Sequence, residues 1–326
     1  MITFLIIGII ILIGFQLTIR KVPTDISYGV SFSKLHANEL GLDWKKAYDA
    51  IIHDLGVKKI RLSAHWPETE PAEGKYNFST LEYQIKGAEQ NNVDVILGVG
   101  RRLPGWPECH EPEWSWGYGE AKKKDLILDY IGATVAHFKG SPAIKMWQVE
   151  NEAFLASFAT YHCRALDESF LQKEIDLVRK LDPSRPVLMT DSGEFGRWLK
   201  PHTYGDVFGT TMYLYTWHKD LGFSRYPIGP GFFRAKQNIL DLLGYKKPRI
   251  LVELAAEPWL PQAIIDTPVE TQLSRMGIDK LNEMIDFASK TGFETQYLWG
   301  AEWWYWLKSQ GHPEYWERAK VLFGAK

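Results

Sequence analysis

The sequence predicts an α/β protein, a closed (β/α)8 TIM barrel that is preceded by an N-terminal transmembrane helix. Beyond residue 25 the chain alternates short apolar runs with amphipathic segments, and eight such units follow one another. Strands that alternate with helices form a parallel sheet, and eight units close into a barrel of typically about 250 residues. An open doubly wound sheet is the alternative, but no Gly-rich phosphate-binding turn follows the first run.

The eight predicted strands are short runs rich in aliphatic and β-branched residues. The fourth is bounded upstream by Gly140, Ser141 and Pro142, and its first part is mostly apolar. In chain order the strands are expected at residues 27–33, 57–65, 93–99, 144–152, 186–190, 206–213, 249–254 and 295–299.

Helices are expected between most of these strands. Asp43 is predicted to cap the first helix, because Trp44, Ala47, Ile51 and Leu55 follow it at helical spacing. Further helices are expected to start near residue 79 and to cover residues 125–138, 168–181, 267–291 and 313–323. Neither a linker nor a low-complexity tract interrupts this pattern, so residues 23–326 are expected to form one domain.

Composition and charge argue against several classes of partner. The net charge is −2 without a basic block, so neither nucleic acid nor a strongly anionic polymer is an expected partner. The 14 Trp and 15 Tyr side chains suit a core as well as loops on which sugar rings lie, and composition leaves both uses open. Cys109 and Cys163 fall in loops after consecutive predicted strands, where a disulfide and two free thiols are equally consistent with the sequence.

A barrel of this kind places its chemistry at the carboxyl ends of its strands. The histidines do not show metal-ligand spacing, since His65, His110, His162 and His218 lie in different loops, and the chain has no Gly-x-Ser-x-Gly elbow. We therefore expect neither a metal nor a cofactor. The residues at the strand ends are Ser33, His65, Trp66, Arg101, Arg102, Asn151, Glu152, Asp191, Glu194, Tyr213, Glu253 and the segment from Trp299 to Trp304.

Two glutamates among these residues suggest a reaction. Glu152 closes the fourth strand region and Glu253 ends the seventh strand, so the two can face each other across the barrel mouth. Cleavage of a glycosidic bond needs one protonated carboxyl and one ionised carboxylate. Burial and neighbouring like charge raise the pKa of one of them and supply that difference. We predict that Glu152 and Glu253 are catalytic; Glu257 is the alternative nucleophile, but it follows the strand rather than ending it.

Other residues are predicted to hold this pair or to bind the substrate. Arg61 within the second strand needs a carboxylate partner in the barrel interior, and Glu253 is the natural one. Tyr213 is expected to hydrogen-bond the same carboxylate, and Asn151 a sugar hydroxyl. The remaining predicted substrate contacts are polar strand-end residues and aromatic platforms, namely His65, Trp66, Arg101, Trp106, Trp299 and Trp303. Not all of the tryptophans can be platforms, because such a residue often belongs to the core.

These motifs resemble those of the retaining glycoside hydrolases of the (β/α)8-barrel clan, to which cellulase-like (family 5) enzymes and related β-glycosidases belong. The similarity in pattern runs from Tyr28 to Trp306, and its specific motifs are Asn151-Glu152 and the strand that ends at Glu253. The resemblance implies that Glu152 is the general acid/base and Glu253 the nucleophile. Gly100-Arg101-Arg102 departs from the cellulase-like pattern, which usually has a His at the end of the third strand.

The sequence thus predicts a monomeric retaining glycoside hydrolase that cleaves a β-linked oligo- or polysaccharide by double displacement. Two alternatives stay open. One is a catalytically inactive barrel that binds glycans or partners at the cell envelope, and the other is a transglycosylase that uses the same residues.

The N-terminus predicts how this domain is held. Residues 1–19 are almost wholly apolar, which is about the length that crosses a bilayer as a helix. A cleaved signal peptide is the alternative, but the basic n-region and the small-x-small cleavage site are absent. We expect residues 1–22 to be an uncleaved membrane anchor. Arg20 and Lys21 after it favour a cytoplasmic barrel, but a domain that acts on polysaccharides is expected on the extracytoplasmic side.

Overall fold

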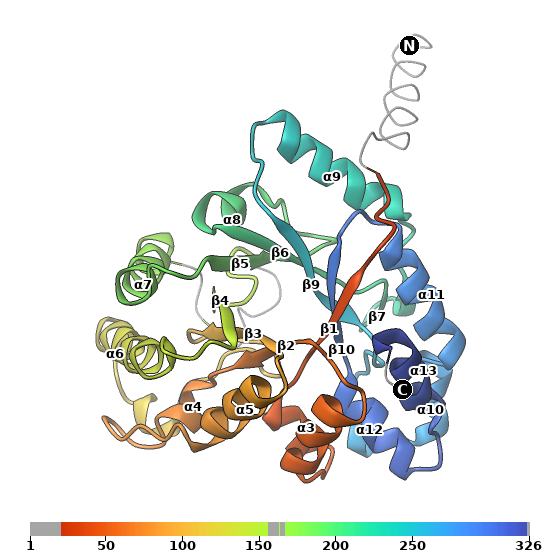
Figure 1. Cartoon of the computed structure of the whole chain (residues 1–326), viewed down its shortest axis with the longest axis horizontal. Coiled ribbons are helices and arrows are strands. Elements are labelled where there is room, and N and C mark those ends of the chain that lie inside the picture. Colours follow the sequence, from red (N-terminus) through yellow and green to blue (C-terminus); the bar gives the residue numbers. More distant parts are fainter. Residues whose placement is uncertain (1–20, 156–162, 164–166, 325–326) are drawn as a thin grey trace.

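A computed structural model describes residues 21–155, 163 and 167–324 of the chain. Eight parallel strands form a closed barrel with helices around it (Figure 1), which confirms the predicted barrel. Their spatial order is β1 (Ser27–Ser31), β10 (Thr295–Trp299), β9 (Arg249–Ala255), β6 (Val207–Met212), β5 (Val187–Asp191), β4 (Ile144–Val149), β3 (Asp94–Val99) and β2 (Lys59–Ser63). Each predicted strand therefore corresponds to one barrel strand.

The predicted helices are present where an amphipathic segment is long enough to define its own period. Asp43 caps α3 (Trp44–His53), and its side chain accepts hydrogen bonds from the amides of Lys45 and Lys46. The other predicted helices are α5 (Ser79–Gln90), α6 (Glu120–Phe138), α7 (Glu168–Leu181) and α13 (Glu314–Phe323). The single helix expected at residues 267–291 is instead two, α10 (Val269–Arg275) and α11 (Ile278–Ser289), because the chain breaks at Met276 and Gly277.

Several elements were not predicted. Four are helical segments of nine residues or fewer, α2 (Lys34–Glu39), α4 (Trp66–Thr69), α8 (Leu199–Tyr204) and α12 (Ala301–Ser309), and one is the longer α9 (Pro230–Leu242). The connection between β6 and α9 also holds an antiparallel hairpin of β7 (Tyr215–His218) and β8 (Gly222–Arg225). Two 3-10 turns, Glu113–Ser115 and Ile264–Asp266, complete the described elements. The four short helices contain too few turns for hydrophobic periodicity to identify them. α9 has 13 residues and was missed although it is long enough to show this periodicity.

The barrel interior is filled by side chains that alternate along the strands. Its apolar cluster consists of Ile96, Leu188, Val207, Ile250, Val252 and Tyr297. Residues between them, such as Leu251 and Leu254, belong to the core between the strands and the helices. Arg61 and Gln148 are likewise buried, and the hydrogen bond between them crosses the barrel interior.

An irregularity in β9 directs Glu253 into the barrel. Thr210 and Thr211 of β6 pair with Leu251 and Glu253, so β9 carries one extra residue at this point. The register between β9 and β10 shifts at the same place. An extra residue reverses the alternation of side chains. Consecutive residues of a regular strand point to opposite sides, but here both Val252 and Glu253 point into the barrel.

The predicted membrane anchor at residues 1–22 lies outside the described residues except for its last two. Among the helices of the described chain, none is both long and apolar enough to cross a bilayer.

Candidate active site

The chain turns sharply where β4 ends, and this turn sets the directions of three polar side chains. Glu150 and Glu152 both have left-handed backbone angles, with φ of 57° and 46°. Such conformations cost about 1–3 kcal/mol each for residues other than glycine and are concentrated at functional sites. Two backbone amides hold the turn: the Asn151 amide donates to the Arg102 carbonyl (2.6 Å), and the Glu152 amide donates to the side-chain hydroxyl of Thr190 (2.8 Å). The strand end is therefore shaped by its neighbours β3 and β5.

Arg61 connects the ends of β4 and β9. Its three nitrogens donate to Gln148 Oε1 (2.8 Å), Glu253 Oε2 (2.5 Å) and Asn151 Oδ1 (2.8 Å). The guanidinium is 2% exposed, and its planar geometry orients all three acceptors at once. The predicted Arg61–Glu253 contact is confirmed. Asn151 Oδ1 also accepts from Thr190, which leaves the amino group of this amide to donate to a ligand.

Besides the hydrogen bond from Arg61, Glu253 accepts one from Tyr213. The phenol of Tyr213 donates to Glu253 Oε1, as expected from the sequence. Burial, and then the negative charge of Glu253, raise the pKa of Tyr213 well above its usual range. The phenol therefore keeps its proton and acts as a donor. Glu253 is held by donors on both oxygens, which stabilises its negative charge and its orientation.

Glu152 has a different environment. Its carboxyl is 7% exposed and accepts a hydrogen bond from Thr211 Oγ1 (2.7 Å). Burial raises the pKa of Glu152 well above its usual range, and the negative charges of Glu108 and Glu253 raise it further. The raised pKa favours Glu152 as the proton carrier. Glu253 accepts hydrogen bonds from a guanidinium and a phenol, which suits a carboxylate that acts as the anion.

A third carboxyl, Glu108, was not predicted from the sequence. It lies in the loop after β3 with its carboxylate 3.8 Å from Arg102 Nη2, and its Oε2 is buried without a hydrogen-bond partner among the described residues. Burial raises the pKa of Glu108 to about 7, and the charge of Glu253 also acts to raise it. The sequence does show that Glu108 lies within the unusual Trp- and Pro-rich stretch of residues 103–116. This stretch does not directly follow a strand end, so the sequence does not indicate where the side chain of Glu108 points.

A disulfide holds the loop that carries Glu108. Cys109 is bonded to Cys163, which resolves the choice that the sequence left open. The bond joins the loop after β3 to Cys163, which lies in the chain between Glu152 and α7. The pairing is consistent with the placement of Glu108 close to Glu152.

Two buried histidines hold the same loop. His65 Nε2 and His110 Nε2 bond the carbonyls of Pro104 (3.0 Å) and Leu103 (3.1 Å), and the two rings lie 4.2 Å apart. Burial lowers the pKa of His65 to about 4 and that of His110 to about 3, so both rings are neutral donors. In this structure His65 supports the wall of the site, and its buried ring is not placed to contact a sugar as predicted.

Glu150 anchors the start of the same loop. Its carboxylate accepts hydrogen bonds from the amides of Arg101 (2.8 Å) and Arg102 (2.6 Å). Gly100 is required beside it, because φ is 123° there and an added Cβ would lie 2.6 Å from Glu150 Oε1. The Arg101 side chain, predicted to bind sugar, is instead paired with Glu111 (2.8 Å) and Glu120 (3.3 Å).

The predicted aromatic platforms fall into two groups. Trp66 and Trp303 are fully buried, and their indole nitrogens donate to Glu70 and Gln272. They pack the core, and the prediction of sugar contacts is corrected for both. Trp106 is 66% exposed in the loop of Glu108, and Trp299 is partly exposed at the end of β10, where its ring stacks with His36. Their contacts with a sugar stay a prediction.

Glu257, the alternative nucleophile, belongs to a separate cluster. Its carboxylate accepts from the indole of Trp299 (2.7 Å) and bonds His36 Nε2 (2.9 Å). Neither Arg61 nor Tyr213 contacts it in the described chain. The other acids at the strand ends accept hydrogen bonds from backbone amides. Asp191 accepts from Trp198, Glu194 from Tyr213 and Glu302 from Ser33.

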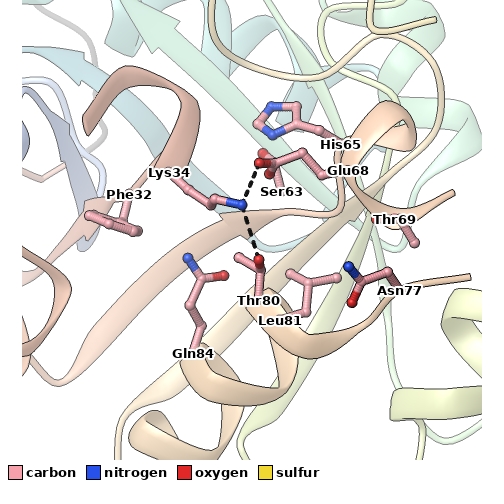
Figure 2. A pocket seen from close by; sticks show the side chains of 10 residues that line it. All are labelled: Phe32, Lys34, Ser63, His65, Glu68, Thr69, Asn77, Thr80, Leu81 and Gln84. Carbon is pink, nitrogen blue, oxygen red and sulfur yellow. Dashed lines mark hydrogen bonds and ion pairs between the residues drawn. The ribbon is translucent and has the colours of Figure 1, made fainter. Parts of the chain in front are cut away.

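A small polar pocket lies beneath His65 but does not extend the site. Figure 2 shows Lys34 reaching across it to Glu68 (2.7 Å) and Thr80 (3.1 Å), with His65 beside them. Its volume is about 10 Å³, which is roughly the space of one water molecule. It is therefore too small for a sugar. Within the described residues no group of three or more His, Cys, Asp or Glu side chains could hold a metal ion.

Comparisons with known proteins show that the chain is similar to glycoside hydrolases. Residues 42–126 match a family model for glycoside hydrolase family 42, described as beta-galactosidase. Beta-galactosidase BgaA from Clostridium cellulovorans is 21% identical over 174 residues, which are 48% of this chain and 26% of that protein. Endo-1,4-beta-xylanase 2 from Claviceps purpurea is 26% identical over 150 residues, 44% of this chain and 43% of that protein. The chain thus spans less than half the length of either relative.

A solved structure extends the similarity in fold to most of the chain. The GH5_18 protein from Bifidobacterium longum subsp. longum has a TM-score of 0.60 and 15% identity, and the match covers 85% of this chain and 70% of that one. The expected resemblance to glycoside hydrolases with (β/α)8 barrels is confirmed. The family match ends before Glu152, so it does not include either of the two glutamates.

Proposed function

We propose that this chain is a retaining glycoside hydrolase that cleaves a β-linked oligo- or polysaccharide by double displacement. The observation that carries the proposal is the contrast between the two carboxyls at the barrel mouth. Arg61 and Tyr213 donate to Glu253, whereas Glu152 is buried with a raised pKa and one hydroxyl donor. An acid and an anion facing one site are what the reaction requires.

In the first step, Glu253 attacks the anomeric carbon while Glu152 donates its proton to the departing oxygen. Arg61 keeps the carboxylate of Glu253 aimed, and the amide of Asn151 is available to donate to a sugar hydroxyl beside the reacting carbon. In the second step, the now ionised Glu152 takes a proton from water, and the hydroxide formed releases the sugar from Glu253. The configuration at the anomeric carbon is retained, because it is inverted twice.

The names of the relatives support a β-linked substrate. Those proteins are called a beta-galactosidase and an endo-1,4-beta-xylanase. Both names refer to β-linkages, and they differ in the sugar. We therefore propose the linkage class and leave the sugar to a substrate panel.

Leaving-group chemistry tests the two roles. Glu152→Ala is expected to nearly abolish cleavage of a natural glycan but to spare the first step on an activated aryl β-glycoside, because a good leaving group departs without a proton. A burst of aryl product should appear, and added azide should restore turnover and give a β-glycosyl azide. Glu253→Ala should be inactive on both substrates, and azide should rescue it with inverted configuration.

The outcome that contradicts the assignment is equally defined. If Glu257→Ala loses all activity while Glu253→Ala remains active, then the nucleophile is Glu257. If the folded wild-type chain does not turn over any member of an aryl β-glycoside and polysaccharide panel, then the barrel is a binding protein. Products longer than the substrate would identify a transglycosylase.

We further propose that the barrel acts outside the cytoplasm, held by the predicted anchor at residues 1–22. The Cys109–Cys163 disulfide supports this location, because disulfides persist in oxidising compartments. Fractionation of the expressed full chain, followed by protease treatment of intact cells, tests the proposal. Protection of the barrel from protease in intact cells would contradict it.

A further inference from the structure

A second cavity lies beside Trp259, a residue that packs on Tyr213. It has a volume of about 190 Å³ and lies between the β7–β8 hairpin, the start of α11 and the segment after β9 that carries Trp259. Trp259 lines it and packs edge-to-face on Tyr213, with ring centroids 5.1 Å apart. Because Tyr213 donates to Glu253, two successive contacts, Trp259 with Tyr213 and Tyr213 with Glu253, connect the cavity wall to the proposed nucleophile. Sites for drug-sized ligands occupy about 300–1,000 Å³, so this cavity suits one sugar unit.

The polar lining of the cavity is basic. Arg225, Arg275 and Lys280 all line it, and no Asp or Glu is among its lining residues in the described chain. One of the three charges is neutralised from outside, since Arg225 Nε lies 3.1 Å from Glu283 Oε1. Lys280 Nζ donates to the carbonyls of Ser274 and Arg275, which are neutral acceptors. The cavity therefore has an excess of positive charge, although the whole chain has a net charge of −2.

Arg275 carries the most specific feature of the cavity. Its guanidinium lies 3.7 Å from the ring centre of Phe223, and its Nε is buried without a hydrogen-bond partner among the described residues. A buried donor on a charged group is unfavourable unless a ligand or water satisfies it. Guanidinium donors form their strongest hydrogen bonds with anionic oxygens.

The aromatic part of the lining complements these charges. Trp259, Phe223 and Tyr215 contribute rings to the same cavity. Such rings contact the apolar C–H groups of a pyranose, while the cations bind an acidic substituent. We propose that this cavity is a subsite for a negatively charged sugar unit, a uronic acid or a sulfated sugar. The proposal rests on the proposed function, since it places this unit on the substrate beyond the bond that Glu152 and Glu253 cleave.

Direct binding tests the subsite without requiring turnover. The full chain is titrated by ligand-observed NMR with D-glucuronate, D-glucose 6-sulfate and D-glucose. At least one of the two anions should bind about tenfold or more tightly than D-glucose, which is the effect expected of a single hydrogen bond to a charged group. The anion that binds more tightly identifies the substituent.

Variants assign that binding to the cavity. Arg275→Met and Lys280→Met should each lower the affinity for the preferred anion about tenfold while affinity for D-glucose changes little. Lys290→Met is the matched control, because Lys290 follows the far end of the same helix, α11, and is paired with Asp286. If Arg275→Met fails to fold by circular dichroism, Lys280→Met still decides the question.

Two results would overturn the inference. The first is equal affinity for all three sugars, and the second is anion binding that the cavity variants leave unchanged. A chain that hydrolyses neutral β-glycosides but shows either result refutes this subsite alone. A chain that binds the anion in the cavity but never hydrolyses a glycoside refutes the proposed function alone.

Discussion

Replacement of Arg61 by Met provides the most direct test of how the active site is organised. The substitution keeps a long apolar side chain but removes hydrogen bonds to Glu253, Gln148 and Asn151. Arg61 is 2% exposed, so water does not readily replace these bonds. Glu253 would retain Tyr213 as a donor but would lose its charged partner.

The expected magnitude follows from the lost bond. A hydrogen bond to a charged group contributes about 1.5–3 kcal/mol, and every 1.36 kcal/mol in activation free energy is tenfold in rate. Loss of the Arg61–Glu253 bond should therefore lower kcat about 10–100-fold. The carboxylate of Glu253 would also be held less firmly in its reactive orientation, so the decrease in kcat should be at least this large. The assay is hydrolysis of an aryl β-glycoside, with kcat expressed per folded molecule.

Arg249→Met is the matched control for this experiment. Arg249 is also a buried arginine and pairs with Asp241 (2.8 Å), but it lies at the start of β9, at the opposite end of the strand from the site. Both variants should lower the free energy of unfolding in urea, and only Arg61→Met should lower kcat. A folded Arg61→Met protein with the kcat of the wild type would refute the role assigned to Arg61.

Three further predictions concern the loop beside the site. Glu108→Gln should lower the pKa of Glu152, because the negative charge of Glu108 raises it. The alkaline limb of the pH profile of kcat/KM should then move to lower pH, and an unchanged limb would contradict this. Cys109→Ser should lower the free energy of unfolding in urea by about 4 kcal/mol relative to the oxidised wild type, from the loss of loop entropy at a separation of 54 residues, and reduced wild type should show a similar loss. Gly100→Ala should destabilise by more than about 1 kcal/mol, because φ is 123° and the added methyl group meets Glu150; Gly117→Ala, where nothing lies within 4 Å, is its control in the same unfolding assay.

Local signals in the sequence were sufficient to predict the barrel. The strand at residues 295–299 and the helix at 168–181 have the predicted bounds, and Asp43 caps its helix as expected. These features depend on neighbours within a few residues, which a single sequence displays directly. The order of elements also predicted that Glu152 and Glu253 lie at the same end of the barrel, because parallel strands bring their carboxyl ends together; their catalytic roles stay a prediction.

Closure of the barrel decided the rest. The sequence could not reveal that an extra residue in β9 turns Glu253 inward, nor that Trp66 and Trp303 are buried rather than open to a sugar. It also left the Cys109–Cys163 pairing open and did not indicate that Glu108 approaches Glu152. Each of these outcomes depends on contacts between residues far apart in the chain. Such contacts are set by strand register and packing, whereas the periodicity of the sequence indicates only which face of its strand or helix a side chain lies on.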